Sequence, residues 1–343
     1  MLEPDPSDTT PLVSIVVPFY NEGEGVTAFF GALQPILDGI DGHRFEIVCV
    51  DDGSSDDTLA RLVAMNRQDA RVRVVELTRN FGKEAALTAG LDETRGAAVI
   101  PLDADLQDPP ELIPLMLEHW HAGAEVVAAR RSDRTSDSLA KRTTAGLFYR
   151  LHNAVSNPRI PQNVGDFRLM DRCVIEALKQ LPERHRFMKG LFAWVGFRTV
   201  QIEYRRPPRS AGQSKFSGWR LWNFALEGIT SFSTVPLRIW TYIGMFIALI
   251  SFLYGGFIVA RTVLFGNPVP GYPSLISVML FMAGIQLIGI GVIGEYVGRI
   301  YDEAKRRPVY LVRQRYGADA APASNAAAVP PVSASEVSRP PSP

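Results

Sequence analysis

The first half of the chain alternates short apolar runs with amphipathic stretches. Apolar runs rich in β-branched residues occur at LVSIVVPF from Leu12, FEIVCVD from Phe45, VRVVEL from Val72 and AAVIPLD from Ala97. Between them, residues 24–37, 57–68 and 83–94 have the composition and length of helices. This alternation favours an α/β fold with a doubly wound, mostly parallel sheet and flanking helices. Such sheets bind ligands at the carboxyl ends of their strands.

The last third of the chain has the pattern of a membrane protein. Residues 216–238 are Trp-rich and carry few charges, which is typical of amphipathic helices at a membrane interface. Apolar segments follow at 240–265 and 274–297, and each exceeds the roughly 20 residues that span a bilayer. Basic residues follow the second segment, so the positive-inside rule places both ends of this hairpin in the cytoplasm.

These patterns predict the organisation of the whole chain. We expect a loose tail at 1–11, a cytosolic α/β domain at 12–215, interface helices at 216–238, two transmembrane helices at 239–298, a basic cytosolic segment at 299–316 and a disordered tail at 317–343. Gly294 and Gly298 form a G-x-x-x-G pattern, which favours close helix packing either within the hairpin or in a homo-oligomer.

Composition and missing motifs exclude several functions. The 36 basic and 36 acidic residues give zero net charge, so charge gives no indication of a nucleic-acid partner. Cys49 and Cys173 match no metal or redox spacing. No G-x-G-x-x-G follows the first strand, and Gly82-Lys83 lacks the rest of a P-loop, which argues against Rossmann dehydrogenases and P-loop NTPases.

A row of polar residues follows the fourth apolar run. Asp103, Asp105 and Gln107 are spaced two apart, so they would point the same way if the strand persisted. Converging carboxylates suit Mg²⁺ or Mn²⁺, which take one or two protein carboxylates and complete their shell with water and substrate phosphates. This indicates a nucleotide diphosphate ligand. Alternatively the acids cap the helix at Pro109, which accounts for Asp108 but not for the others.

Other candidate residues lie after the neighbouring runs. Tyr20 can stack on a base, and Asp52 can accept hydrogen bonds from a base or a ribose. Arg79 and Lys83 lie at a helix start, which suits a phosphate, although a solvated loop could contain the same residues. Asp166 follows a glycine and is either a turn residue or a reaction-centre acid.

The segment RRPPRSAGQSKFS is rich in Pro, Gly and Ser, and its cations could close over phosphates.

The combination of motifs resembles a known family. VPFYNE, VDDGSSDDT, RNFGKEAAL, LDADLQDPPE, GDFRLMD, RHRFMKGLFAWVGF and RSAGQSKFS, followed by two apolar segments, are similar to membrane-anchored GT-A glycosyltransferases of family 2. The resemblance is to the polyprenyl-phosphate glycosyltransferases, such as bactoprenol glucosyltransferases and dolichyl-phosphate mannose synthases. It runs from about Ser14 to Arg307. No Q-x-x-R-W motif occurs, which argues against a polysaccharide synthase.

The resemblance implies roles for individual residues. Asp103 and Asp105 would be the DxD acids at the metal, with Gln107 beside them, and Asp166 would be the acid at the reaction centre. The acceptor phosphate would contact Arg130 with Lys141 or Arg142. The nucleotide sugar would contact nine residues, among them Lys83, which is included because it lies at a helix start. They are Pro18, Tyr20, Glu22, Asp52, Arg79, Lys83, Asp103, Arg209 and Lys215.

The expected reaction is inverting transfer of one hexose from UDP-glucose to undecaprenyl phosphate, with Mg²⁺ or Mn²⁺, at the cytosolic face of the bacterial inner membrane. Alternative donors are GDP-mannose and UDP-linked N-acetylhexosamine or aminoarabinose. A different alternative is a non-catalytic membrane module that binds nucleotide sugar or recruits a flippase. A flippase and a downstream glycosyltransferase are the further partners that such a product would need.

Overall fold

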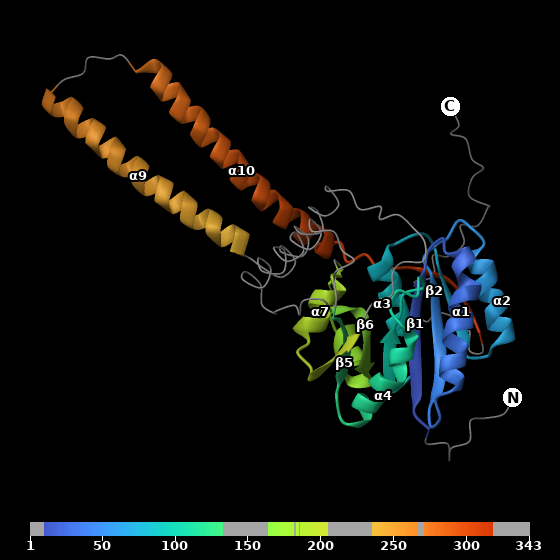
Figure 1. Ribbon diagram of the computed structural model, residues 1–343. Helices are drawn as coiled ribbons and strands as arrows, with labels where there is room; N and C mark the ends of the chain where they lie inside the picture. Colours follow the sequence, from blue (N-terminus) through green and yellow to red (C-terminus); the bar gives the residue numbers. More distant parts are fainter. Residues whose placement is uncertain are drawn as a thin grey trace, which may run out of the picture.

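The computed structural model describes residues 10–132, 164–181, 183–184, 186–204, 235–265 and 271–317. It shows an α/β domain from which a long helical hairpin projects (Figure 1). Within these residues eight strands form one sheet, in the order β7-β5-β6-β4-β1-β2-β3-β8.

The first half of the domain is the doubly wound unit that the apolar runs predict. Its strands β1, β2, β3 and β4 are parallel: β1 pairs with β2 and β4, and β2 pairs with β3. The predicted helices match α1, α2 and α3 to within one residue at each end. The elements are β1 (Leu12–Phe19), α1 (Gly23–Asp38), β2 (Arg44–Asp51), α2 (Thr58–Gln68), β3 (Val72–Leu77), α3 (Lys83–Glu93), β4 (Ala98–Pro101), η1 (Pro110–Leu112) and α4 (Ile113–His121).

The second half reverses one strand. It contains β5 (Val126–Arg131), β6 (Val164–Asp171), α6 (Arg172–Lys179), α7 (Met188–Trp194) and β7 (Thr199–Tyr204). Strand β6 is antiparallel to both β4 and β5, whereas β5 and β7 are parallel. Because of this reversal, β6 begins at the edge where β1, β2 and β4 end. Asp166 is therefore brought to the carboxyl edge of the parallel strands.

Helices cover both faces of the sheet. Phe29 and Leu33 of α1 are buried in the core on one face, while Leu87 of α3 and Ile175 of α6 are buried on the other. A Cβ at Gly90 would lie 2.3 Å from Val16 Cγ1, so α3 lies close against β1. This close packing fixes where the first residues of α3 meet the strand ends.

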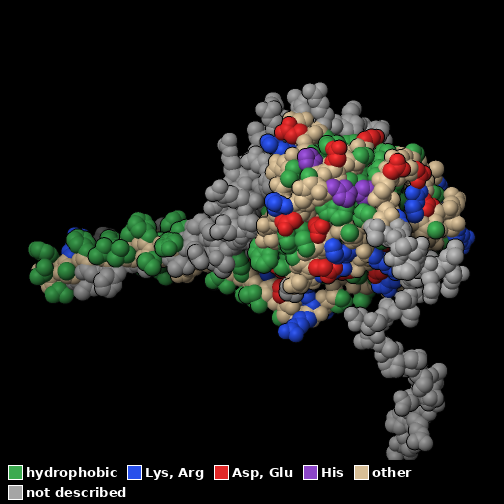
Figure 2. All heavy atoms as spheres, turned by 90° about the horizontal axis from the view of Figure 1, so that it is seen from below, with side chains coloured by type: hydrophobic (Ala, Val, Ile, Leu, Met, Phe, Trp, Pro, Cys, Tyr) green, Lys and Arg blue, Asp and Glu red, His purple; other side chains and the backbone are tan. Residues whose placement is uncertain are grey.

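The hairpin consists of α9 (Val235–Phe265) and α10 (Tyr272–Ala304), which contain the two predicted apolar segments. Figure 2 shows its surface dominated by apolar side chains, whereas the α/β domain carries both charges. Examples are Phe246 and Phe281, which are 64% and 68% exposed. Within the described residues, Phe281–Ala304 is long and apolar enough to cross a membrane, with mean hydropathy 1.5.

After the hairpin the chain returns to the domain and adds β8 (Val312–Tyr316), antiparallel to β3. The sequence pattern predicts only a basic segment here and no strand. The arginines pair with acids of the domain: Arg313 Nη1 lies 3.1 Å from the buried Glu76 Oε1, and Arg315 Nη2 lies 2.6 Å from the half-buried Glu93 Oε1. Tyr316 donates a hydrogen bond to Glu76 Oε2 at 2.9 Å. Strand β8 therefore neutralises acids that β3 and α3 would otherwise leave at the sheet edge.

The end of α10 is also tied to the domain. Glu303 Oε1 accepts a hydrogen bond from the Arg184 backbone N–H at 2.9 Å, and Arg184 Nη1 donates to the Asp302 carbonyl at 3.0 Å. The hairpin thus contacts the domain through the foot of α10 and through β8.

We expect a chain that ends at Arg307 to lose stability, because it loses the pairing of β8 with β3 and the partners that β8 gives to Glu76 and Glu93. Each hydrogen bond lost costs about 0.5–1.5 kcal/mol, so the melting temperature in detergent should fall by about 5 °C or more. A chain that ends at Gly317 keeps every contact of β8 and is the matched control. Equal melting temperatures for the two truncations would contradict the role given to β8.

Candidate active site

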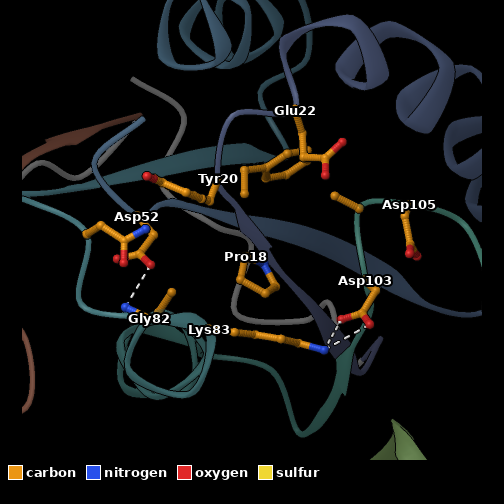
Figure 3. A pocket seen from close by; sticks show the side chains of 12 residues that line it. Pro18, Tyr20, Glu22, Asp52, Gly82, Lys83, Asp103 and Asp105 are labelled. Atoms are coloured by element: carbon orange, nitrogen blue, oxygen red, sulfur yellow. Dashed lines mark hydrogen bonds and ion pairs between the residues drawn. The ribbon is translucent and has the colours of Figure 1, made fainter. Parts of the chain in front are cut away.

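A pocket opens at the carboxyl ends of β1, β2 and β4 (Figure 3). It brings together six of the nine residues predicted to contact a nucleotide sugar, along with Asp105. Its lining is Pro18, Phe19, Tyr20, Glu22, Asp52, Asn80, Gly82, Lys83, Ala86, Asp103, Ala104 and Asp105.

The loops that form the pocket are bonded to one another. After β1, the Asn21 backbone N–H donates to Ser54 Oγ at 3.0 Å, and Asn21 Oδ1 accepts from the Ser55 N–H at 2.8 Å. After β2, Gly53 has φ +65°, and a Cβ there would lie 2.4 Å from the carbonyl carbon of Arg79. A side chain at Gly53 would therefore displace the loop after β3.

Asp52 holds that third loop in place. Its two carboxylate oxygens accept the backbone N–H groups of Phe81 at 2.7 Å and Gly82 at 2.9 Å. Burial raises the pKa of Asp52, and these two hydrogen bonds oppose the rise. Arg79 stacks on the Phe81 ring at 4.0 Å and does not line the pocket. Asp52 thus shapes the loop that leads into α3, and its contact with a base or ribose stays a prediction.

The expectation that Asp103, Asp105 and Gln107 continue an extended row is wrong. Strand β4 ends at Pro101, and Leu106 has φ +52°. Asp105 Oδ1 accepts the Gln107 backbone N–H at 3.1 Å, a local bond that favours a turn over an extended chain. In this turn Gln107 is buried, and it is not part of the pocket lining.

The alternative interpretation, in which Asp108 caps the helix at Pro109, is not what the structure shows. The start of η1 has no side-chain cap. The buried Asp108 carboxylate instead accepts a hydrogen bond from Tyr204 and lies 3.9 Å from Arg131 Nη2. It joins the turn after β4 to β5 and β7.

Lys83, the first residue of α3, bridges two carboxylates. Its Nζ lies 2.7 Å from Asp103 Oδ1 and 3.1 Å from Asp166 Oδ2; Figure 3 shows Lys83 and Asp103 pointing toward each other below Pro18. Burial alone would lower the pKa of Lys83, but the two carboxylates raise it well above its usual value. Burial raises the pKa of Asp103 despite the ammonium. The three groups form one coupled cluster of opposite charges.

Further charges surround Asp166. Burial would raise its pKa, yet Lys83, Lys189 and Arg168 together hold it below the usual value. Arg168 stacks on the Phe192 ring at 4.0 Å and donates to the Gly165 carbonyl at 2.7 Å.

Sequence reasoning missed these two cations. Arg168 could have been found, because residues two apart in a strand share a face. The position of Lys189 in the sequence gives no comparable indication that it lies near Asp166.

Glu84, the second residue of α3, is also part of this environment. Burial and the negative charge of Asp166 raise its pKa to about 7. Glu84 therefore has a raised pKa beside Asp166, and nothing in the sequence pattern indicated this.

The donor set fits a metal that arrives with a diphosphate. The described residues contain no cluster of three or more His, Cys, Asp or Glu side chains arranged to hold an ion. Asp103 and Asp105 both line the pocket, and Mg²⁺ needs only one or two carboxylates when substrate phosphates supply further oxygens.

Four predicted residues, Lys141, Arg142, Arg209 and Lys215, lie outside the described residues. The segments that contain them begin after the carboxyl ends of β5 and β7, at the edge that carries the pocket. Arg130 lies at the end of β5, where its Nη1 is 3.8 Å from Glu203 Oε1. It shares this edge but does not line the pocket.

Comparison with known proteins gives two family matches. Residues 14–179 match glycosyl transferase family 2, and residues 235–300 match the GtrB C-terminal hairpin. A bactoprenol glucosyl transferase of Shigella phage SfX is 56% identical over 303 residues, which cover 88% of this chain and 99% of that protein. A prophage bactoprenol glucosyl transferase homolog of Escherichia coli (strain K12) is 53% identical over 302 residues, covering 88% and 98%.

Among solved structures, glucosyl-3-phosphoglycerate synthase from Mycobacterium tuberculosis in complex with uridine-diphosphate matches with a TM-score of 0.43 and 21% identity, covering 64% of this chain and 79% of that one. The family assignment rests on the sequence matches, which extend across the α/β domain and the hairpin. This chain is a glycosyltransferase of family 2, with a GT-A fold and a GtrB-type C-terminal hairpin.

Proposed function

We propose that the protein transfers glucose from UDP-glucose to undecaprenyl phosphate, with inversion at the anomeric carbon, at the cytosolic face of the bacterial inner membrane. The observation that carries this proposal is the 56% identity to a bactoprenol glucosyl transferase over 88% of the chain. The likeness includes the hairpin as well as the pocket, so it covers the parts that would meet the lipid and the donor. GDP-mannose and other UDP-sugars are the alternative donors.

The position of the hairpin supports a lipid acceptor. We propose that α9 and α10 both span the membrane. Arg184, which contacts the foot of α10, lies in the connection that leads into α7, and Lys189 of α7 acts on Asp166 by its charge. A lipid phosphate at the membrane surface would then lie near the pocket. Arg130, with Lys141 or Arg142, would bind that phosphate.

The pocket supports a nucleotide sugar donor. Tyr20 is 47% exposed and can stack on a base, while Pro18, Glu22 and Asp52 line the same pocket. Lys83 is the first residue of α3, and a helix N-terminus favours phosphate. Arg79, Arg209 and Lys215 would add charge around the diphosphate from the surrounding loops.

Mg²⁺ or Mn²⁺ would be held by Asp103 and Asp105 together with the diphosphate. Gln107 is left out of this set because it is buried away from the pocket. When bound, the metal would offset the negative charge that develops on the departing diphosphate.

The acceptor needs no general base. The second pKa of a phosphate monoester is about 6, so at neutral pH the acceptor is mostly a dianion. A phosphate oxygen attacks the anomeric carbon, the bond to the diphosphate breaks, and UDP leaves with that electron pair. Asp166 is held in its ionised form by Lys83, Lys189 and Arg168, and we assign it to orienting the sugar and Lys83.

A donor panel tests the reaction. Purified protein in detergent, undecaprenyl phosphate, Mg²⁺ or Mn²⁺ and radiolabelled UDP- and GDP-sugars should give a lipid product with UDP-glucose. Asp105→Asn should lower turnover more than about 100-fold, because the amide keeps the shape but loses the charge facing the metal. Full turnover in EDTA would exclude the metal, and absence of product with every donor would favour a non-catalytic module.

The pH dependence tests the role of Asp166. Both wild type and Asp166→Asn should lose kcat/KM below roughly pH 6, because the acceptor phosphate gains a proton there. The lowered pKa of Asp166 keeps it ionised above that range. Glu84 titrates near neutral pH, so Glu84→Gln is measured alongside. If the acid limb disappears in Asp166→Asn alone, Asp166 is a base and the mechanism is wrong.

The topology can be tested by cysteine labelling in spheroplasts. In a Cys173→Ser background, a cysteine at Gly271, between α9 and α10, should react with an impermeant maleimide added outside. A cysteine at Lys305 should react only after lysis. Labelling of both positions from the same side would be incompatible with two membrane spans.

A further inference from the structure

Lys83 lies between two acids, Asp103 and Asp166. A metal that binds Asp103 would compete with Lys83 for this position. Its ammonium lies 2.7 Å from Asp103 Oδ1 and 2.9 Å from Asp103 Oδ2. It also lies 3.1 Å from Asp166 Oδ2. Both oxygens of a proposed metal ligand are therefore paired with a cation from the protein itself.

The lysine can leave this position more easily than the acids can. The Lys83 side chain is 47% exposed, whereas Asp103 and Asp166 are 30% and 16% exposed. A lysine stem has four flexible carbons, and its backbone is fixed at the start of α3, so the ammonium can swing while the helix stays in place. The pocket that it faces is the one proposed for the diphosphate.

Asp103 needs a counter-charge whether or not ligands are bound. Burial raises its pKa, and the negative charges of Asp166 and Asp108 add to that effect. Without a neighbouring cation these acids would repel one another. Because the Lys83 ammonium contacts both oxygens of Asp103, a divalent ion that binds this carboxylate competes with it, and the two positive charges repel each other at a few ångströms.

We propose that Lys83 is an exchangeable counter-cation: it neutralises Asp103 in the empty site and moves to the donor diphosphate when the metal binds Asp103. This inference rests on the metal-dependent reaction proposed above and adds a coupling between its two ligands. The metal competes with Lys83 for Asp103, and the diphosphate supplies the negative charge that receives the lysine. Metal binding is therefore weak without nucleotide and is strengthened by it.

The test measures Mn²⁺ binding and involves no turnover. Free Mn²⁺ is followed by electron paramagnetic resonance during titration of the full-length protein in detergent, with and without UDP. Without UDP, Lys83→Met and Lys83→Gln should each bind Mn²⁺ at least about tenfold more tightly than wild type. With UDP, the gain in Mn²⁺ affinity should be smaller in both variants than in wild type.

Lys189→Met is the matched control. Lys189 also acts on Asp166 by its charge, but it is not among the largest influences on the pKa of Asp103, whereas Lys83 is. Its removal should change Mn²⁺ affinity less than about threefold. Thermal unfolding of each variant checks that it is folded.

Unchanged or weaker Mn²⁺ binding in both Lys83 variants would overturn the proposal, because it would make Lys83 a fixed structural partner of Asp103. An equal gain in Lys189→Met would overturn it too, because general electrostatics would then account for the effect. Either result leaves the glucosyl transfer intact, since that reaction is judged by the lipid product. Failure of glucosyl transfer would appear in the donor panel, independently of metal affinity.

Discussion

The site depends on the balance of charge around Asp103, Lys83 and Asp166. Two acids from different strands would repel each other at the sheet edge, and one ammonium between them makes the arrangement stable. The packing of α3 against β1 at Gly90 sets where that ammonium lies. The reversal of β6 sets where the second acid lies. The fold thus serves to bring three charged groups from distant parts of the sequence to one place.

The same use of charge connects the membrane part to the domain. Strand β8 brings arginines to acids on β3 and α3, and Glu303 of α10 accepts from Arg184. These contacts tie the foot of α10 to the domain. They limit the range of orientations between the pocket and the hairpin, which suits a lipid acceptor.

Sequence patterns predicted the parts of the site that depend on parallel strands. Pro18, Tyr20, Asp52 and Asp103 each lie at or just after the end of an apolar run, and parallel strands place their carboxyl ends together. The residues that were missed depend on longer-range geometry. Gln107 lies in a turn whose backbone is bonded by Asp105, and the pairing of Lys83 with Asp166 follows only from the antiparallel β6. Strand β8 was missed because its alternating arginines look like a solvated basic segment until Glu76 and Glu93 are placed beside them.

In the proposed reaction a phosphate oxygen of a lipid attacks glucose directly, with inversion. The most direct measurement is nuclear magnetic resonance of the lipid product formed from UDP-glucose, because the donor is an α-glucoside and inversion must yield a β-linkage to phosphorus. Inverting transfer should give a β-anomeric signal split by coupling to the lipid phosphate. An α-linked product, or glucose released to water without coupling to phosphorus, would contradict it.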